Sequence, residues 1–146
     1  MNPDPQPEEA VHIRIRGLTM AFGSTVVMEN LDFAIHRGDI FVIMGPSGSG
    51  KSTLMRHMIG LLEPAGGEIL YSGRSFTGAT GRERVAILRR IGVMYQRGAL
   101  WTSLTLAENV ALPLEEFTDY SRRQIRSIVD YKLSLVGLSG FGDYYP

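Results

Sequence analysis

The chain of 146 residues contains no cysteine, which excludes disulfide bonds and thiolate metal sites. It has no net charge, because 15 lysine and arginine residues balance 15 aspartate and glutamate residues. The basic residues are scattered, so no nucleic-acid partner is expected. No apolar run reaches the roughly 18 residues that suggest a membrane-spanning helix. With 44% apolar and 21% charged residues, the composition is that of one globular domain.

The N-terminal stretch is rich in proline and acidic residues and has no signal-like segment. Residues 1–10 are therefore expected to form a flexible leader, and the chain is expected to stay on the cytoplasmic side. Apolar and polar residues then alternate at 11–16 and again at 31–36. This period of two predicts half-buried, antiparallel strands.

A phosphate-binding loop is the most informative motif in the chain. Residues 45–52 read Gly-Pro-Ser-Gly-Ser-Gly-Lys-Ser and match G-x-x-x-x-G-K-[ST] at every fixed position. Residues 40–44 are apolar throughout, as in a strand covered on both faces, and residues 54–59 carry apolar side chains at helical spacing. Strand, loop and helix thus follow in the order that the motif needs. This context disfavours the alternative of a flexible Gly/Ser-rich loop with a chance lysine.

Each residue type in this loop has a physical role in binding a nucleoside triphosphate. Glycines can adopt positive φ and carry no Cβ, so successive N–H groups can surround a phosphate, and a helix beginning near Gly50 adds its positive end. Lys51 can reach the β- and γ-phosphates, and the Ser52 hydroxyl can ligate magnesium. The expected nucleotide-binding residues of the loop are Gly45, Pro46, Ser47, Gly48, Ser49, Gly50, Lys51, Ser52 and Thr53.

Further elements are expected after the loop. A short strand is predicted at 68–71, a helix at 82–90 and a buried strand at 91–95. A helix at 104–112 is expected to end at Pro113. The last helix, 121–136, has a capping box and an apolar stripe that should face inward. The stripe residues are Ile125, Ile128, Val129 and Val136, and the capping residues are Ser121 and Gln124.

Three further segments make the chain resemble the ATP-binding subunit of an ABC transporter. Phe22 precedes the loop by about two dozen positions, where this family places an aromatic residue that stacks on adenine. Residues 93–96, Val-Met-Tyr-Gln, are similar to the family's Q-loop, and residues 104–110, Leu-Thr-Leu-Ala-Glu-Asn-Val, are similar to the segment that opens its helical subdomain. The resemblance covers about residues 11–146.

The resemblance implies an α/β fold of the P-loop NTPase class and of ABC ATPase type. It implies an incomplete domain with an N-terminal antiparallel β portion and the start of the helical subdomain. Residues 11–95 would be the N-terminal part of the nucleotide-binding core, and residues 96–146 the Q-loop and the beginning of the helical subdomain. ATP and Mg²⁺ would be the cofactors. Lys51 and Gln96 would be catalytic, Ser52 and Gln96 would hold magnesium, and Phe22 would stack on adenine.

The resemblance also implies partners and a cellular role. An ABC ATPase subunit couples ATP hydrolysis to transport, dimerises head to tail with a second ATPase subunit, and lies on the inner face of the membrane against a transmembrane permease subunit. Residues 96–101 and 109–114 look most like the ATPases of Mla-type and Mce-type lipid transporters, so the substrate is expected to be phospholipid. Leu100 and Trp101 are candidate docking residues, and a packed tryptophan is the equal alternative.

The later motifs of the family are not found in these 146 residues. The sequence has no Leu-Ser-Gly-Gly-Gln signature, no apolar strand ending in Asp-Glu and no switch histidine. Residues 138–142 superficially resemble the signature and are expected to form a helix-terminating loop. The chain is thus expected to be truncated before the signature and not competent for turnover. A vestigial, non-catalytic nucleotide-binding product, and a soluble P-loop kinase or GTPase, are the alternatives.

Overall fold

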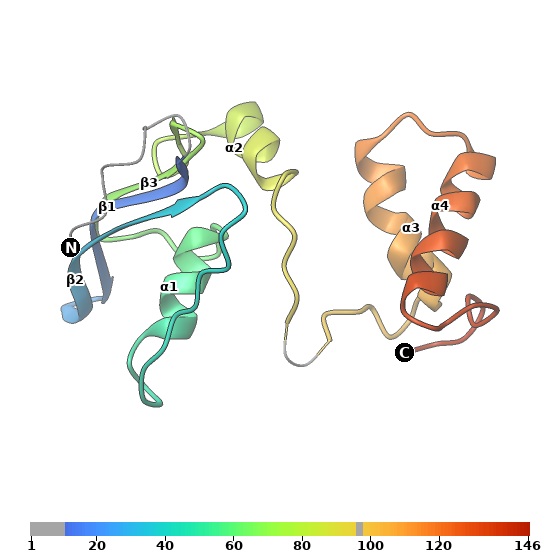
Figure 1. The fold of residues 1–146 in the computed structure, drawn as a ribbon, viewed down its shortest axis with the longest axis horizontal. Helices are drawn as coiled ribbons and strands as arrows, with labels where there is room; N and C mark the ends of the chain where they lie inside the picture. Colours follow the sequence, from blue (N-terminus) through green and yellow to red (C-terminus); the bar gives the residue numbers. More distant parts are fainter. Residues whose placement is uncertain (1–10, 96–97) are drawn as a thin grey trace. The chain divides into compact units, whose positions relative to one another are not determined.

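The computed structural model describes residues 11–95 and 98–146. The chain divides into two compact units, one ending at Gly92 and one spanning Val93–Pro146. Within its described part the first unit holds a sheet and the helices α1 (Lys51–Met58) and α2 (Gly81–Leu88), and the second holds α3 (Leu106–Phe117) and α4 (Arg122–Leu135) (Figure 1). No helix in the described ranges is long and apolar enough to cross a membrane.

The sheet of the first unit is antiparallel and has the strand order β2-β1-β3-β4. The strands are β1 (Val11–Phe22), β2 (Thr25–His36), β3 (Gly66–Tyr71) and β4 (Arg74–Ser75). Three of the five strands expected from the sequence, at 11–16, 31–36 and 68–71, are confirmed as β1, β2 and β3. All three are longer than expected. The largest differences are in β1 and β2, because their hairpin contains register shifts that break the simple alternation while pairing continues to its turn.

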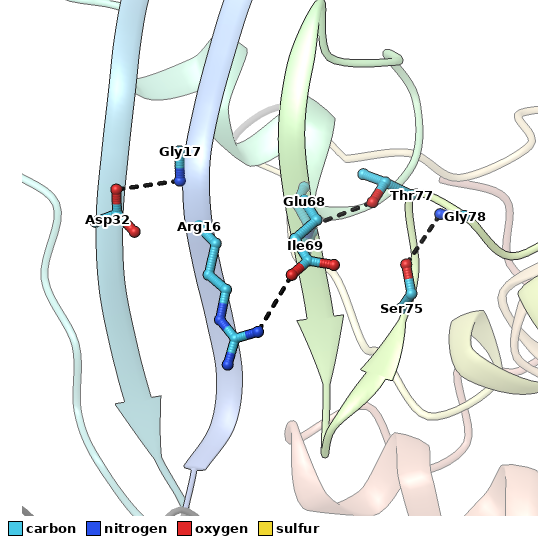
Figure 2. A network of polar contacts seen from close by, with 8 residues as sticks. All are labelled: Arg16, Gly17, Asp32, Glu68, Ile69, Ser75, Thr77 and Gly78. Carbon is cyan, nitrogen blue, oxygen red and sulfur yellow. Dashed lines mark hydrogen bonds and ion pairs between the residues drawn. The ribbon is translucent and has the colours of Figure 1, made fainter.

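Side-chain hydrogen bonds reinforce the sheet where its ladder is irregular (Figure 2). The pairing of β1 and β2 shifts register between Ile15 and Leu18, and there the Gly17 N–H donates to the Asp32 carboxylate at 3.1 Å. The carboxylate thus satisfies a backbone donor inside the register shift. The remaining contacts in Figure 2 are Arg16 to Glu68, Ile69 N–H to the Thr77 hydroxyl, and Gly78 N–H to the Ser75 hydroxyl.

The core of the first unit lies between the sheet and its helices. Leu54 and Met58 of α1 and Ile87 of α2 are buried in one cluster with the strands. The Tyr71 hydroxyl donates to the carbonyl oxygen of Met58 at 2.7 Å, which joins the end of β3 to the end of α1. Burial raises the pKa of this tyrosine to about 12. The other members of the cluster are Ile15, Leu18, Met20, Ile69, Phe76 and Ala79.

The second unit is a pair of helices, α3 and α4, joined by a short loop (Figure 1). Both helices begin with a capping box, Thr105 with Glu108 and Ser121 with Gln124. Hydrogen bonds from the backbone and side chain of Thr105 lower the pKa of Glu108. The expected box at Ser121 is confirmed, and residues 138–142 form turns beyond α4 as expected. The carbonyl of Gly142 accepts from the Ala107 N–H at 2.9 Å, so this loop also covers the start of α3.

Two details of these helices differ from the expectation. Pro113 lies inside α3 and does not end it. A proline inside a helix removes only one main-chain hydrogen bond. The helix continues past it because Leu114, in the following turn, packs against the buried side chains of α4. In α4, Ile125 and Val129 are buried as expected, but Val136 is 70% exposed because the helix ends at Leu135, and Leu133 completes the stripe instead.

The two segments expected to be buried strands, 40–44 and 91–95, are not strands in the structure. Ile40 is 95% exposed and Met94 is 97% exposed. An apolar run becomes a strand only when a neighbouring strand pairs with its N–H and C=O groups, and neither segment pairs with a strand of the described sheet. Segment 40–44 still contacts the sheet through Phe41, because the Phe41 ring stacks on the Phe33 ring of β2 with 5.2 Å between the ring centroids.

Gly67 offers a test of the contact between β1 and β3. Its φ is +79°, and a Cβ added there would lie 2.3 Å from the carbonyl oxygen of Gly17. We expect Gly67→Ala to lower the free energy of unfolding by at least about 1–3 kcal/mol, because both the backbone conformation and the clash must be accommodated. The measurement is chemical denaturation followed by circular dichroism.

The neighbouring Gly66 supplies the matched control. A Cβ at Gly66 would lie 3.8 Å from the Thr19 Cβ, which is ordinary contact, so Gly66→Ala should be neutral or stabilise the strand slightly. Equal destabilisation by the two substitutions would show that the close approach at Gly67 is not what matters.

Tyr71→Phe should make the pH dependence of stability visible. At neutral pH the variant should lose roughly 0.5–1.5 kcal/mol, because the Met58 carbonyl loses its buried donor. The folded pKa of about 12 exceeds the usual 10.0, so this contribution is complete below pH 10 and is lost as the pH rises toward 12. The difference in unfolding free energy between wild type and variant should therefore shrink in that window, and a difference independent of pH would contradict the assignment.

Candidate functional site

The phosphate-binding loop lies between the exposed segment 40–44 and the start of α1. Gly48 and Gly50 have φ values of +81° and +88°, which confirms that the loop needs glycine at these positions. The helix begins at Lys51, and Gly50 is its N-cap residue. The expected order of loop and helix is therefore correct, although the segment before the loop is not a strand.

The Lys51 ammonium group is held over the loop. It donates to the carbonyl oxygens of Gly45 at 2.8 Å and Pro46 at 2.6 Å, and to the Ser49 hydroxyl at 3.2 Å. These contacts use the three donors of an ammonium group. The positive charge is thus placed within the curve of the loop, close to its backbone.

Two close approaches explain why the loop has glycines at its ends. A Cβ at Gly45 would lie 2.8 Å from the Ser49 hydroxyl. A Cβ at Gly50 would lie 3.0 Å from Val27 Cγ1, with the Met28 and Met20 side chains also within contact distance. The start of α1 is therefore seated directly on the β1–β2 hairpin, which positions the loop relative to the sheet.

The first turn of α1 is suited to an anion. The first N–H groups of any helix lack partners within the helix, and here Gly50 provides no side-chain cap. No acidic residue lies in this turn, so nothing in it neutralises the positive end of the helix. The Ser52 side chain is exposed and Thr53 is half-buried. Loop, lysine and helix start together form one electropositive site.

The residues fit a magnesium ion that is carried by a nucleotide. No cluster of three or more histidine, aspartate or glutamate side chains occurs in the part of the chain that the structure covers. Mg²⁺ commonly binds one or two protein oxygens together with substrate phosphates and water. The exposed hydroxyl of Ser52, at the start of the anion-binding helix, matches that type of site.

The other two expected site residues, Phe22 and Gln96, lie outside the phosphate-binding loop. Phe22 is the last residue of β1 and is 52% exposed. Phe22 pairs with Thr25 at the turn of the β1–β2 hairpin, and Met20 and Met28 of the same hairpin have side chains near Gly50. Gln96 lies outside the described residues, so the structure does not place it.

The candidate docking residues form part of an exposed turn in the second unit. Trp101 is 64% exposed and Leu100 is 50% exposed, so the alternative of a packed tryptophan is wrong. Asn109 holds this turn: its side-chain oxygen accepts from the Trp101 N–H at 2.8 Å, and its amide donates to the Trp101 carbonyl at 3.0 Å. Sequence reasoning did not assign this role to Asn109, and an asparagine in the first turn of a helix was the available signal.

Comparison with known proteins identifies the family. The family described as "ABC transporter" matches residues 28–143. The "Probable ribonucleotide transport ATP-binding protein mkl" of Mycobacterium leprae is 41% identical over 136 residues, 93% of this chain and 39% of that protein. The "Intermembrane phospholipid transport system ATP-binding protein MlaF" of Haemophilus influenzae is 40% identical over 134 residues, 92% of this chain and 51% of that protein. The chain thus spans about half or less of the length of these relatives.

Solved structures agree with the sequence comparison. The chain is similar to the "Dimeric structure of a post-hydrolysis state of the ATP-binding cassette MJ0796 bound to ADP and Pi", with 29% identity and a TM-score of 0.81 over 92% of this chain and 61% of that chain. The expected fold class is confirmed: the structure is a partial P-loop domain with an antiparallel sheet and a few helices. On the match of residues 28–143, which include the phosphate-binding loop, this chain belongs to the ABC transporter family.

Proposed function

We propose that this chain binds Mg-ATP through residues 45–53 as the nucleotide-binding part of an ABC transporter ATPase. The observation that carries the proposal is the position of the Lys51 ammonium group. It lies within the glycine loop, at the uncapped start of α1, and is hydrogen-bonded to Gly45 and Pro46. A polyphosphate entering the loop would exchange these neutral acceptors for charged ones, which form stronger hydrogen bonds with an ammonium group.

Individual roles follow from this arrangement. The loop N–H groups and the first turn of α1 would bind the phosphates, and Lys51 would neutralise the β/γ charge. Ser52 would hold magnesium together with Gln96, and Ser52→Ala should therefore make nucleotide affinity less dependent on magnesium. Phe22, the exposed last residue of β1, would stack on adenine, so Phe22→Ala should weaken the binding of ATP more than that of inorganic triphosphate.

We propose the roles of the whole protein by family membership. As part of an ABC ATPase subunit, the chain would pair head to tail with a second ATPase subunit and contact a transmembrane permease subunit on the cytoplasmic face of the membrane. ATP hydrolysis in that assembly would drive transport. The relative from Haemophilus influenzae is described as a phospholipid transport protein, and with the resemblance at residues 96–101 this supports phospholipid as the substrate.

We propose that the core extends over residues 11–95 and the Q-loop with the beginning of the helical subdomain over residues 96–146. The compact units divide after Gly92, close to this boundary. A nucleotide-binding chain without turnover is the second candidate function. Phosphate release measured beside nucleotide affinity distinguishes the two candidates.

Lys51→Ala tests the proposed binding site. We expect at least about a tenfold loss of affinity for Mg-ATP, because hydrogen bonds between charged groups contribute roughly 1.5–3 kcal/mol. Isothermal titration calorimetry measures the change. The chain has only one other lysine, Lys132 on α4, and Lys132→Ala is the matched control. Full nucleotide affinity in a folded Lys51→Ala protein would remove the central role proposed here.

Trp101→Ala tests docking to the membrane partner. Exposed aromatic side chains that anchor an interface typically contribute about 2 kcal/mol or more, so co-purification with the permease subunit should fall strongly while Mg-ATP affinity is unchanged. Tyr131 of α4 is similarly exposed, at 60%, and Tyr131→Ala is the control. Equal recovery of the partner with both variants would count against the docking role.

A further inference from the structure

A pocket lies at the opposite end of the β1–β2 hairpin from the phosphate-binding loop. Its volume is about 300 Å³, and its polar lining comes from His12, Arg37, Ser72, Arg74 and Arg90. His12 is near the start of β1, where Val11 pairs with His36, whereas Met20 and Met28 pair near the phosphate-binding loop. Eight residues of strand separate His12 from Met20, which corresponds to roughly 25 Å. The two sites are therefore distinct.

Two side chains, the Arg37 guanidinium and the His12 imidazole, meet at one hydroxyl in this pocket. The Ser72 hydroxyl lies 3.3 Å from Nδ1 of His12 and accepts from the Arg37 guanidinium at 3.2 Å. Ser72 itself is fixed in the turn after β3, with φ of +48°, and its N–H donates to the His12 carbonyl at 2.8 Å. The hydroxyl and its donors thus stand on rigid ends of strands.

Arginine side chains predominate among the polar residues of this pocket. Three arginines and a histidine line it, and no carboxylate occurs among its described lining residues. Elsewhere in the same unit arginines do have acidic partners, Arg16 with Glu68 and Arg84 with Glu63. Like charges gathered in one place repel one another, and an anion in the pocket would relieve this repulsion.

The base of the pocket is apolar and firm. Tyr71 and Ile87 line it, and both side chains are buried in the core cluster. The carbonyl oxygens of Ile87 and Leu88 at the end of α2 already accept hydrogen bonds from Arg90 and Ile91 N–H groups. A group placed on this base is therefore met by arginine and histidine donors and not by unpaired acceptors.

We propose that this pocket binds a phosphoryl group, separately from the nucleotide site. Guanidinium groups donate two parallel hydrogen bonds that match phosphate oxygens, and the volume is at the lower end of the range for small-molecule sites. The phosphoryl group belongs either to a soluble diphosphate or to an anionic lipid headgroup. Both present the same oxygens to Arg37, Arg74 and Arg90.

The experiment uses the full chain with Lys51→Ala as background, so that the phosphate-binding loop contributes little. Pyrophosphate is titrated while the amide resonances of Ser72 and Arg74 are followed by NMR. In parallel, sedimentation with phosphatidylcholine vesicles is compared with and without phosphatidic acid. The test variant adds Arg74→Gln and Arg90→Gln. The control adds Arg56→Gln and Arg82→Gln, which remove the same charge from exposed positions of α1 and α2 outside this pocket.

We expect the test variant, and not the control, to weaken binding at least about tenfold in one of the two arms. Loss in the pyrophosphate arm assigns a soluble diphosphate, and loss in the vesicle arm alone assigns a lipid headgroup. The proposal is overturned if neither probe binds the background protein, or if the test and control variants bind equally. Mg-ATP affinity with Lys51 intact is a separate measurement, so failure here leaves the proposed nucleotide site in place.

Discussion

The contact between Gly50 and the β1–β2 hairpin is the constraint on which the nucleotide site depends. A Cβ at this position would lie 3.0 Å from Val27 Cγ1 and φ is +88°, so glycine lets the start of α1 come this close to the strands without backbone strain or displacement of Val27. The approach turns the positive end of the helix and the Lys51 ammonium group toward one concave stretch of backbone. All described strands of this sheet are antiparallel, and residues 40–44 before the loop do not form a strand. The loop is therefore positioned by the contact between α1 and the hairpin.

Local sequence patterns predicted the elements that local interactions determine. The loop, the start of α1 and the capping box at Ser121 are encoded within a few neighbouring residues, and the structure has all three. Hairpin pairing was also predictable, because alternation in two nearby segments indicates which faces are buried. These successes concern contacts that are close in sequence.

The errors concern partners that are distant in sequence. Residues 40–44 and 91–95 have the composition of buried strands, but composition does not tell which strand pairs with them, and no strand of the described sheet does. The sequence predicts a helix end at Pro113 because the missing N–H of proline is a local property, whereas the packing of Leu114 against α4 depends on residues distant in the sequence. The basic pocket around Ser72 was missed for the same reason, since its residues come from both ends of the first unit's sequence.

The way in which Asn109 holds the turn before α3 determines which substitutions the turn tolerates at position 101. Its side chain bonds to the main-chain N–H and C=O of Trp101 and to the main-chain carbonyls of Leu104 and Thr105, and these are groups that nearly every amino acid possesses. The Trp101 indole is exposed to solvent, and the hydrogen bonds that hold the turn do not involve it. Under the docking role proposed for Trp101, a substitution at this position would change the group that meets the partner while the main-chain hydrogen bonds that hold the turn stay intact.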